Sequence, residues 1–434
     1  MPGRAPHVAF VLSHLNQLKL YLPILEKAGQ LGEENTYVLL HKTDKSDNAL
    51  RNRIEAKGNV AYEPFTEEED LHVILETTKV DILITEDVSF VYLKNHVAGL
   101  KIFYLQHSHD IISAFPSKYT LNQLLKIDKF LVFSEFWKEK FIKTLDIRYK
   151  DYKSDISEIE KRTAPVGFPE LEQIKDFSKK IIHKKYNIKI PKGGIIFLDP
   201  IGNVNHVGNA YYGYFFKLHG SVGNKIIIFL KQFFYDFYHF PLKIPRIIRL
   251  IFKIYSSKNL LVNYQTLVEQ LSEYCSKNDA LLVIKSRKKN NDPSFIKDLS
   301  DYYSFDLDYY PFTLLELLFI SNFYIGFNST TTLEAISCGS NALQLNVCPE
   351  EFQYQNYAGG IYQYLDDTLS TEFSWNNYPG LIEVVKHSKP MEELFTKFNF
   401  EVEDILKDQY INKFLMDLNN SSMRVIKEIN NYHE

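Results

Sequence analysis

The sequence has few cysteines, and they follow no recognisable spacing. Its 434 residues include 3 cysteines, Cys275, Cys338 and Cys348, an odd number without a Cys-x-x-Cys pair. They provide neither a disulfide framework nor a cysteine metal site, and they fit a reducing compartment. We therefore expect a cytoplasmic protein, and we expect no metal ion and no cofactor.

Long uncharged stretches and a strong net charge are also missing. No 18 consecutive residues lack a charge, which excludes a predicted membrane span. The apolar stretch near the N-terminus ends at Ser13 and His14, so it is too short for a signal peptide. The net charge of −4 argues against nucleic acid as the main partner.

The chain is long enough for two domains, since 434 residues with 45% hydrophobic content exceed the size of a single core. In the first part, short apolar runs alternate with helical or polar pattern, as in parallel strands that are covered on both faces. These runs are 7–12, 36–40, 59–64, 81–85, 101–105 and 129–134. They predict a doubly wound, Rossmann-like α/β domain over residues 1–166.

A second series of strands predicts a second domain of the same kind. Its runs are 194–199, 280–286, 322–329 and 341–347. Gly167 and Pro169 interrupt the periodicity before a charged helical stretch, so we place a linker at 167–190 and the second domain at 191–378. The tail, 379–434, has helical periodicity and no strand pattern.

An insert at 225–257 differs from the rest of the second domain. It has the pattern of two amphipathic helices, rich in Phe and Ile, and residues 225–258 carry seven basic residues against one acid, Asp236. One interpretation is that the apolar faces pack on the second domain. The other is contact with a membrane surface, because basic faces attract anionic headgroups while Phe and Ile enter the boundary.

The stretch NFYIGFNSTTTLEAISCG, 322–339, predicts a phosphate-binding loop. A strand that ends near Gly326 is followed by small polar residues and then by a helix containing Glu334. The free amides of a helix start at the carboxyl end of a strand favour a phosphate, although a capping box explains some of these residues. The candidate phosphate ligands are Asn328, Ser329, Thr330 and Thr331, and Glu334 either faces a ribose hydroxyl or lies on the helix surface.

Two neighbouring strand ends of the second domain add further candidates. Lys285 lies near the end of the run 280–286 and Arg287 follows it, and basic groups there would converge on the same anion. Gly202 and Asn203 follow the strand 194–199, where glycine permits a close approach of the backbone to a ligand.

Titratable side chains gather at strand ends of the first domain. The sequence YLQHSHDI places His107, His109 and Asp110 directly after a strand. Glu86 and Asp87 follow the strand 81–85, and Asp87 is a second candidate base. Histidine ordinarily titrates near pH 6.5, which suits a general base.

Taken together, these elements resemble the GT-B glycosyltransferases that build bacterial capsule, teichoic-acid and lipopolysaccharide chains. The resemblance rests on the two α/β domains, on VGFPELEQI near the linker, on GFNSTTTLEAISCG, and on YLQHSHDI, which is similar to a Gln-His-Gly strand end. It implies two Rossmann-like domains that face a central cleft, with a helical C-terminal tail. Lys285 corresponds to the first residue of a Lys-x-His-Pro element in sialyltransferases, but here the His and Pro are absent.

The resemblance implies a role for each group of residues. The second domain would bind a nucleotide-sugar donor, and the first would bind a glycan or lipid-linked glycan acceptor, with Ser13, His14 and Asp110 in the acceptor site. His107 would be the base, oriented by His109, and no metal would be needed. Three alternatives stay open: transfer of an alditol phosphate from a CDP-alditol, epimerisation of a sugar nucleotide, and a non-catalytic scaffold.

Overall fold

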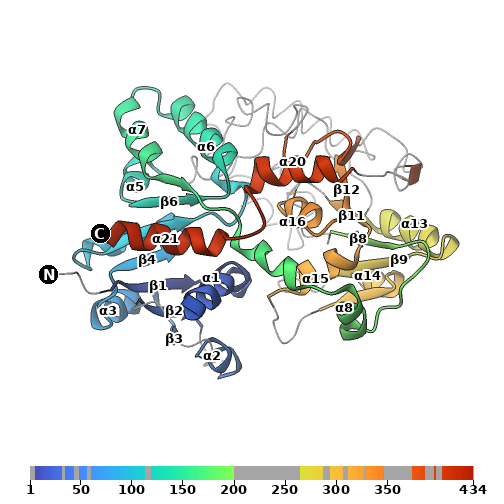
Figure 1. Ribbon diagram of the computed structural model, residues 1–434, viewed down its shortest axis with the longest axis horizontal. Coiled ribbons are helices and arrows are strands. Elements are labelled where there is room, and N and C mark those ends of the chain that lie inside the picture. Colours follow the sequence, from blue (N-terminus) through green and yellow to red (C-terminus); the bar gives the residue numbers. More distant parts are fainter. Residues whose placement is uncertain are drawn as a thin grey trace, which may run out of the picture. The chain divides into compact units, whose positions relative to one another are not determined.

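The computed structural model describes most of the chain as two compact units (Figure 1). The first unit comprises residues 1–176 and 408–434, and the second comprises 177–407. The described residues are 5–31, 35–43, 48–55, 60–112, 119–199, 264–286, 294–305, 311–326, 329–346, 374–386, 395–396 and 403–433.

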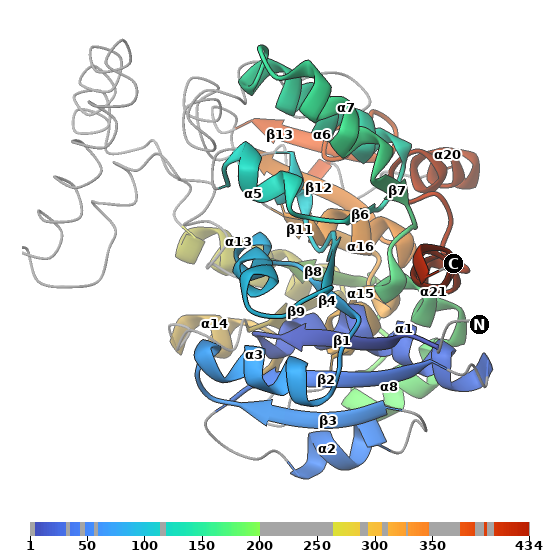
Figure 2. The ribbon, with the colours of Figure 1, turned by 90° about the vertical axis from the view of Figure 1, so that its left-hand side faces the viewer.

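The first unit is built on a seven-stranded parallel sheet in the order β3-β2-β1-β4-β5-β6-β7. Figure 2 shows β1, β2 and β3 side by side. The strands are β1 (His7–Leu12), β2 (Thr36–Lys42), β3 (Val60–Phe65), β4 (Ile82–Thr85), β5 (Lys101–Leu105), β6 (Lys129–Val132) and β7 (Thr163–Pro165). Residues of β1, β4 and β5 are almost completely buried, which explains their continuous apolar sequences.

Helices connect these strands, as parallel pairing requires. They are η1 (Leu15–Gln17), α1 (Leu18–Leu31), α2 (Asn48–Glu55), α3 (Glu68–Thr77), η2 (Val88–Asn95), η3 (His109–Ile111), α5 (Leu121–Leu125), α6 (Glu135–Arg148), α7 (Lys153–Lys161) and η4 (Pro169–Asp176). The aromatic core beneath α6 includes Phe133, which stacks on Phe168 with ring centroids 4.2 Å apart. Trp137 on α6 is completely buried in the same region.

The second unit has a six-stranded parallel sheet in the order β10-β9-β8-β11-β12-β13. Its strands are β8 (Ile195–Leu198), β9 (Leu281–Lys285), β10 (Tyr302–Ser304), β11 (Phe323–Gly326), β12 (Asn341–Asn346) and β13 (Ile382–Lys386). Its helices are α8 (Lys179–Tyr186), α13 (Tyr264–Lys277), α14 (Ser294–Leu299), α15 (Thr313–Ile320) and α16 (Thr331–Ser337). Leu271, Leu282 and Leu343 form part of one buried cluster that joins α13 to the sheet.

The C-terminal segment returns to the first unit. Helix α20 (Asp404–Leu415) is followed by α21 (Ser421–His433), which packs on α1. Trp137 Nε1 donates a hydrogen bond to the carbonyl oxygen of Phe414, 2.8 Å away, and Arg424 Nε donates to the carbonyl oxygen of Val166 at 2.9 Å. These bonds fix the C-terminal segment to residues of the first unit that lie far away in sequence.

The sequence-based prediction of two parallel α/β domains with C-terminal helices is confirmed. The prediction of a tail without strands is wrong at β13, where Ile382 and Val384 extend the second sheet by pairing with β12. This strand was missed because it lies at the sheet edge and is only five residues long. The boundaries at 166, 190 and 378, and the cleft, stay predictions.

Two further sequence-based expectations concern membranes. The insert 225–257 lies outside the described residues. Among the residues that are described, no helix combines the length and the apolar character needed to cross a bilayer.

Candidate functional site

Three strand ends meet at the carboxyl edge of the first sheet. Strand β1 pairs with β4, and β4 pairs with β5, all in parallel. The chain passes from β1 to β2 on one side and reaches β4 on the other, so the strand order reverses between β1 and β4. Open α/β sheets bind ligands at such a switch point, outside the carboxyl ends of the strands.

Side chains from these three strand ends form a connected group, Gln17–Glu86–His107. Gln17 Nε2 donates a hydrogen bond to Glu86 Oε1 at 2.5 Å, across the β1/β4 switch point. The other carboxylate oxygen, Oε2, lies 3.1 Å from His107 Nδ1. This places a carboxylate oxygen beside the Nδ1 atom of the histidine ring.

Glu86 is held in a fixed position but is not fully satisfied. Gln17 is 2% exposed, and its Oε1 accepts a hydrogen bond from the backbone N–H of His14 at 2.9 Å. Glu86 Oε2 is buried and makes no aligned hydrogen bond within the described residues. The contact to His107 is therefore a close approach of Oε2 to Nδ1, at 3.1 Å, without an aligned hydrogen bond. Catalytic hydrogen bonds of ligand-free sites often align only when substrate binds.

A buried tyrosine lies beneath this group. Tyr21 on α1 is completely buried. Burial, together with the negative charges of Glu86 and Asp87, raises the pKa of Tyr21 well above its usual value. The Tyr21 hydroxyl therefore keeps its proton at pH values where an ordinary tyrosine ionises.

Asp87 has a different environment from Glu86. As the N-cap of η2, its Oδ1 accepts hydrogen bonds from the backbone N–H of Ser89 at 2.8 Å and from the Tyr119 hydroxyl at 2.7 Å. Burial and the hydrogen bond to Asp87 raise the pKa of Tyr119. Asp87 thus anchors the start of η2 and the Tyr119 side chain.

The loop after β5 is positioned by a buried amide. Gln106 is completely buried, accepts a hydrogen bond from Phe133 N–H at 2.9 Å, and donates one to the carbonyl oxygen of Ser108 at 3.0 Å. These two bonds fix the backbone on both sides of His107, which is 24% exposed at its side chain. The Gln106 amide therefore links the end of β6 to the backbone just after His107, whose side chain is partly exposed.

The other predicted residues of the first domain lie on the same edge. Ser13 is half-buried and His14 is exposed at the end of β1, and His109 is half-buried at the start of η3. Asp110 lies in η3, and only its backbone is described. Of these predicted residues, the structure brings Glu86 to His107.

In the second unit, the predicted phosphate-binding residues lie around the start of α16. Ser329 Oγ is 3.1 Å from Thr331 Oγ1 and accepts a hydrogen bond from Thr331 N–H at 3.3 Å. Thr332 is completely buried and its hydroxyl bonds to Gln344 of β12. Thr330 is half-buried. The hydroxyls of Ser329 and Thr332 therefore maintain the local structure, whereas Thr330, the N-cap of α16, makes no capping hydrogen bond through its side chain.

Acidic side chains of the second unit are buried near the same strand ends. Glu334 is 3% exposed, so it does not lie on the helix surface, which was one of the two expectations. Asp199, after β8, accepts a hydrogen bond from the Tyr324 hydroxyl at 3.0 Å. A Cβ atom at Gly326 would lie 2.4 Å from the Tyr324 ring, which explains why glycine ends β11.

Lys285 ends β9, and its Nζ lies 3.4 Å from the carbonyl oxygen of Ser286. Four of the predicted donor-site residues lie outside the described residues: Asn328, Arg287, Gly202 and Asn203. Within the described part of the chain, no group of three or more His, Cys, Asp or Glu residues could hold a metal ion.

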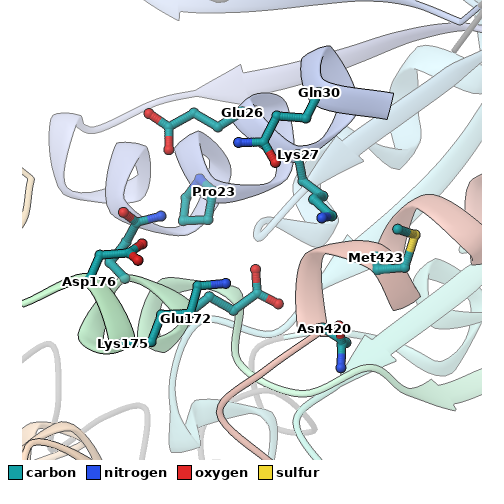
Figure 3. A pocket seen from close by; sticks show the side chains of 10 residues that line it. Pro23, Glu26, Lys27, Gln30, Glu172, Lys175, Asp176, Asn420 and Met423 are labelled. Atoms are coloured by element: carbon teal, nitrogen blue, oxygen red, sulfur yellow. The ribbon is translucent and has the colours of Figure 1, made fainter. Parts of the chain in front are cut away.

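A pocket of about 110 Å³ lies elsewhere in the first unit (Figure 3). It is lined by α1, η4 and α21, with Lys27, Glu172 and Met423 among its walls. The figure shows acidic and basic groups around one opening. None of the strand-end residues predicted from the sequence lines it. This pocket is therefore separate from the Gln17–Glu86–His107 group.

The sequence paired Glu86 with Asp87 but gave no reason to choose Glu86, and it did not indicate Gln17. Both partners become evident only when the sheet order places β1, β4 and β5 together. A signal was nevertheless present, since each residue follows a buried strand within a few positions.

No protein-family model matches the chain, and no curated protein matches it in sequence. Solved structures do match it in fold. A glycosyltransferase from Rickettsia africae is 13% identical over 99% of both chains, with a TM-score of 0.51. The wall teichoic acid polymerase TagF, H444N variant, is 11% identical over 99% of this chain and 89% of that chain, with a TM-score of 0.56.

An epimerase is equally similar. UDP-GlcNAc 2-epimerase from Neisseria meningitidis, solved with UDP-GlcNAc bound, is 12% identical over 98% of this chain and 100% of that chain, with a TM-score of 0.54. At these identities the likeness concerns the fold alone. The chain has the two-domain GT-B-like fold that these glycosyltransferases and this epimerase share.

Proposed function

We propose that the protein transfers a sugar from a nucleotide-activated donor to the hydroxyl group of a surface-glycan acceptor, with His107 as the general base. The observation that carries this proposal is the Gln17–Glu86–His107 group at the switch point of the first sheet. The GT-B-like fold supports it, since TagF and the Rickettsia glycosyltransferase have this fold.

The proposed mechanism assigns a role to each atom of this group. If His107 carries its proton on Nδ1, facing Glu86, then Nε2 has a free lone pair for the acceptor hydroxyl. Nε2 takes the hydroxyl proton while the acceptor oxygen forms a bond to the anomeric carbon. The bond from that carbon to the donor phosphate breaks, and its electron pair leaves with the phosphate. The Glu86 carboxylate then stabilises the imidazolium.

The second unit would receive the negative charge of the leaving phosphate. We assign this role to the start of α16, where Ser329, Thr330 and Thr331 combine hydroxyls with helix amides. Lys285, Arg287, Asn328, Gly202 and Asn203 belong to the same proposed donor site, with Glu334 near the ribose. Ser13, His14 and Asp110 belong to the proposed acceptor site, with His109 beside the base. The chemistry proposed for these residues requires no metal.

Epimerisation of a sugar nucleotide is the second candidate. It is favoured by the close placement of Glu86 and His107, two groups able to exchange protons with a bound sugar, and by the epimerase that shares the fold. An epimerase would act on the donor alone, without an acceptor.

Two measurements test these candidates. A thermal-shift screen against UDP-, CMP-, GDP- and CDP-linked compounds identifies the donor, because a ligand that binds the folded state raises the melting temperature. Nucleotide release is then measured with and without an oligosaccharide acceptor. Release that requires acceptor supports transfer, and epimerised donor without acceptor supports the second candidate. Transfer of an alditol phosphate from a CDP-alditol would contradict both sugar transfer and epimerisation. A protein that reacts with none of these donors would instead fit the non-catalytic scaffold.

A further inference from the structure

The segment 179–192 of the second unit is strongly basic. It contains six lysines and no acidic residue, in a chain whose net charge is −4. The lysines are Lys179, Lys180, Lys184, Lys185, Lys189 and Lys192. The segment starts with α8 and ends shortly before β8.

The same segment exposes two large apolar side chains. Ile190 is 76% exposed and Ile181 is 67% exposed, the two highest values among the exposed large hydrophobic residues of the described chain. Two isoleucines in water forgo the favourable free energy that burial of their apolar surface would contribute to folding. Both isoleucines lie in the lysine-rich segment 179–192, so exposed apolar surface and positive charge occur together there.

The fold explains why these side chains point outward. Helix α8 packs on α15 and buries Ile182 and His183. Lys180, Ile181 and Lys184 lie on the other side of the helix, because residues three and four apart share a face. The helix ends at Asn187, which has a positive φ of 52°, and Ile190 follows in the next stretch.

All six lysines of this segment are exposed, and two of them lie close to groups of α15. Lys185 Nζ is 2.6 Å from the buried Glu316 carboxylate, and Lys179 Nζ lies 6.0 Å from the centre of the Phe319 ring. Lys180, Lys184 and Lys189 are exposed. We call these three lysines with Ile181 and Ile190 the α8 basic surface.

We infer that the α8 basic surface docks on an anionic lipid bilayer. Its lysine ammonium groups match the negative charge of the headgroups, and Ile181 and Ile190 match the apolar boundary beneath them. A soluble polyanion would use the lysines but would give the two isoleucines no partner. This surface is separate from residues 225–257, and the inference holds whether or not the chain transfers a sugar.

Co-sedimentation with vesicles tests this inference on the full chain. The vesicles contain phosphatidylcholine alone, or phosphatidylcholine and phosphatidylglycerol in equal parts. The first variant, Lys180→Gln/Lys184→Gln, removes charge, and the second, Ile181→Ser/Ile190→Ser, removes apolar surface. The controls make matched changes on exposed residues of the first unit: Lys153→Gln/Lys161→Gln on α7, and Val73→Ser on α3, where Val73 is 53% exposed.

We expect the wild-type protein to bind the anionic vesicles and not the neutral ones. Each lysine near an anionic surface changes the partition coefficient by roughly fivefold, so the double lysine variant should lose roughly 25-fold. The isoleucine variant should also lose binding, and both controls should bind like the wild type. Unchanged binding of either α8 variant, equal binding to neutral vesicles, or no binding by the wild type would each overturn the inference.

Discussion

Glu86, at the end of β4, lies 3.1 Å from His107, at the end of β5, through one carboxylate oxygen and the Nδ1 atom of the ring. The other carboxylate oxygen is held by Gln17 from the β1 side. A histidine oriented in this way by a carboxylate is the arrangement that general-base catalysis uses in unrelated folds. The first two predictions concern this group.

Replacing Glu86 by Gln keeps the size of the side chain and removes the charge beside His107. We expect the rate of nucleotide release to fall by roughly 10- to 1000-fold, because the developing imidazolium loses its counter-charge. The matched change Glu63→Gln, on the exposed face of β3, should leave the rate unchanged. Equal rates for Glu86→Gln and the wild type would show that the carboxylate has no role in the reaction.

Replacing Gln17 by Leu tests a positioning residue that touches no substrate in the proposed mechanism. The change removes a buried hydrogen bond to Glu86 and should cost about 1–3 kcal/mol of stability. We expect kcat to fall because Glu86 loses its orientation, with a smaller rise in the KM for acceptor, because the backbone N–H of His14 also loses its hydrogen-bond partner. A rise in KM alone would instead place Gln17 in substrate binding.

Two glycines of the first unit separate backbone strain from steric clash. Gly99 and Gly167 have φ values of +78° and +87°, but a Cβ atom at Gly99 meets nothing within 4 Å, whereas at Gly167 it lies 2.2 Å from Ser421 Oγ. Gly99→Ala should cost about 1–2 kcal/mol from the left-handed backbone. Gly167→Ala should cost roughly 2–5 kcal/mol, because α21 must also move.

Urea unfolding followed by tryptophan fluorescence measures both glycine variants. The chain has 2 tryptophans, so a Trp375→Phe background leaves Trp137 as a reporter of the first unit. Equal losses of stability for the two variants would contradict the close packing of residue 167 on α21.

The stability of the first unit should depend on pH through Lys140. Burial, with the nearby charges of Lys143 and Lys413, lowers the pKa of Lys140 from 10.5 to about 8. Between pH 8 and 10.5 the unfolded state therefore binds more protons at this residue than the folded state. The contribution of Lys140 to the free energy of unfolding should rise with pH across this window and stay constant below it.

The difference between the wild type and Lys140→Met isolates this contribution, because other lysines titrate in the same range. The same difference measured for Lys153→Met, on exposed α7, should not change with pH. A flat difference for Lys140 would show that its amine is fully solvated.

Much of the fold could be predicted from the sequence, because its central strands are short, apolar and buried on both faces. The strand at 7–12 was predicted with its observed bounds. The edge strands β7, β10 and β13 were missed, since edge positions impose less apolar pattern on three to five residues. Strand β12, by contrast, which begins at Asn341, was predicted from its apolar sequence.

The candidate site was less accessible to sequence reasoning for a physical reason. A strand end can be recognised from its own residues, but its neighbours depend on sheet order, which is a long-range property. His107 could therefore be selected, whereas its contact with Glu86 and the hydrogen bond from Gln17 could not. Likewise, the burial of Glu334 depends on how α16 packs, and both environments agreed with its sequence.

The rate of nucleotide release by His107→Gln tests the central claim most directly. The donor is the compound that raises the melting temperature of the wild type, and His96→Gln, at an exposed histidine after η2, is the control. We predict that His107→Gln still binds the donor but releases nucleotide roughly 100- to 10,000-fold more slowly, while His96→Gln matches the wild type. A His107→Gln protein that retains the wild-type rate would contradict the assignment of His107 as the base.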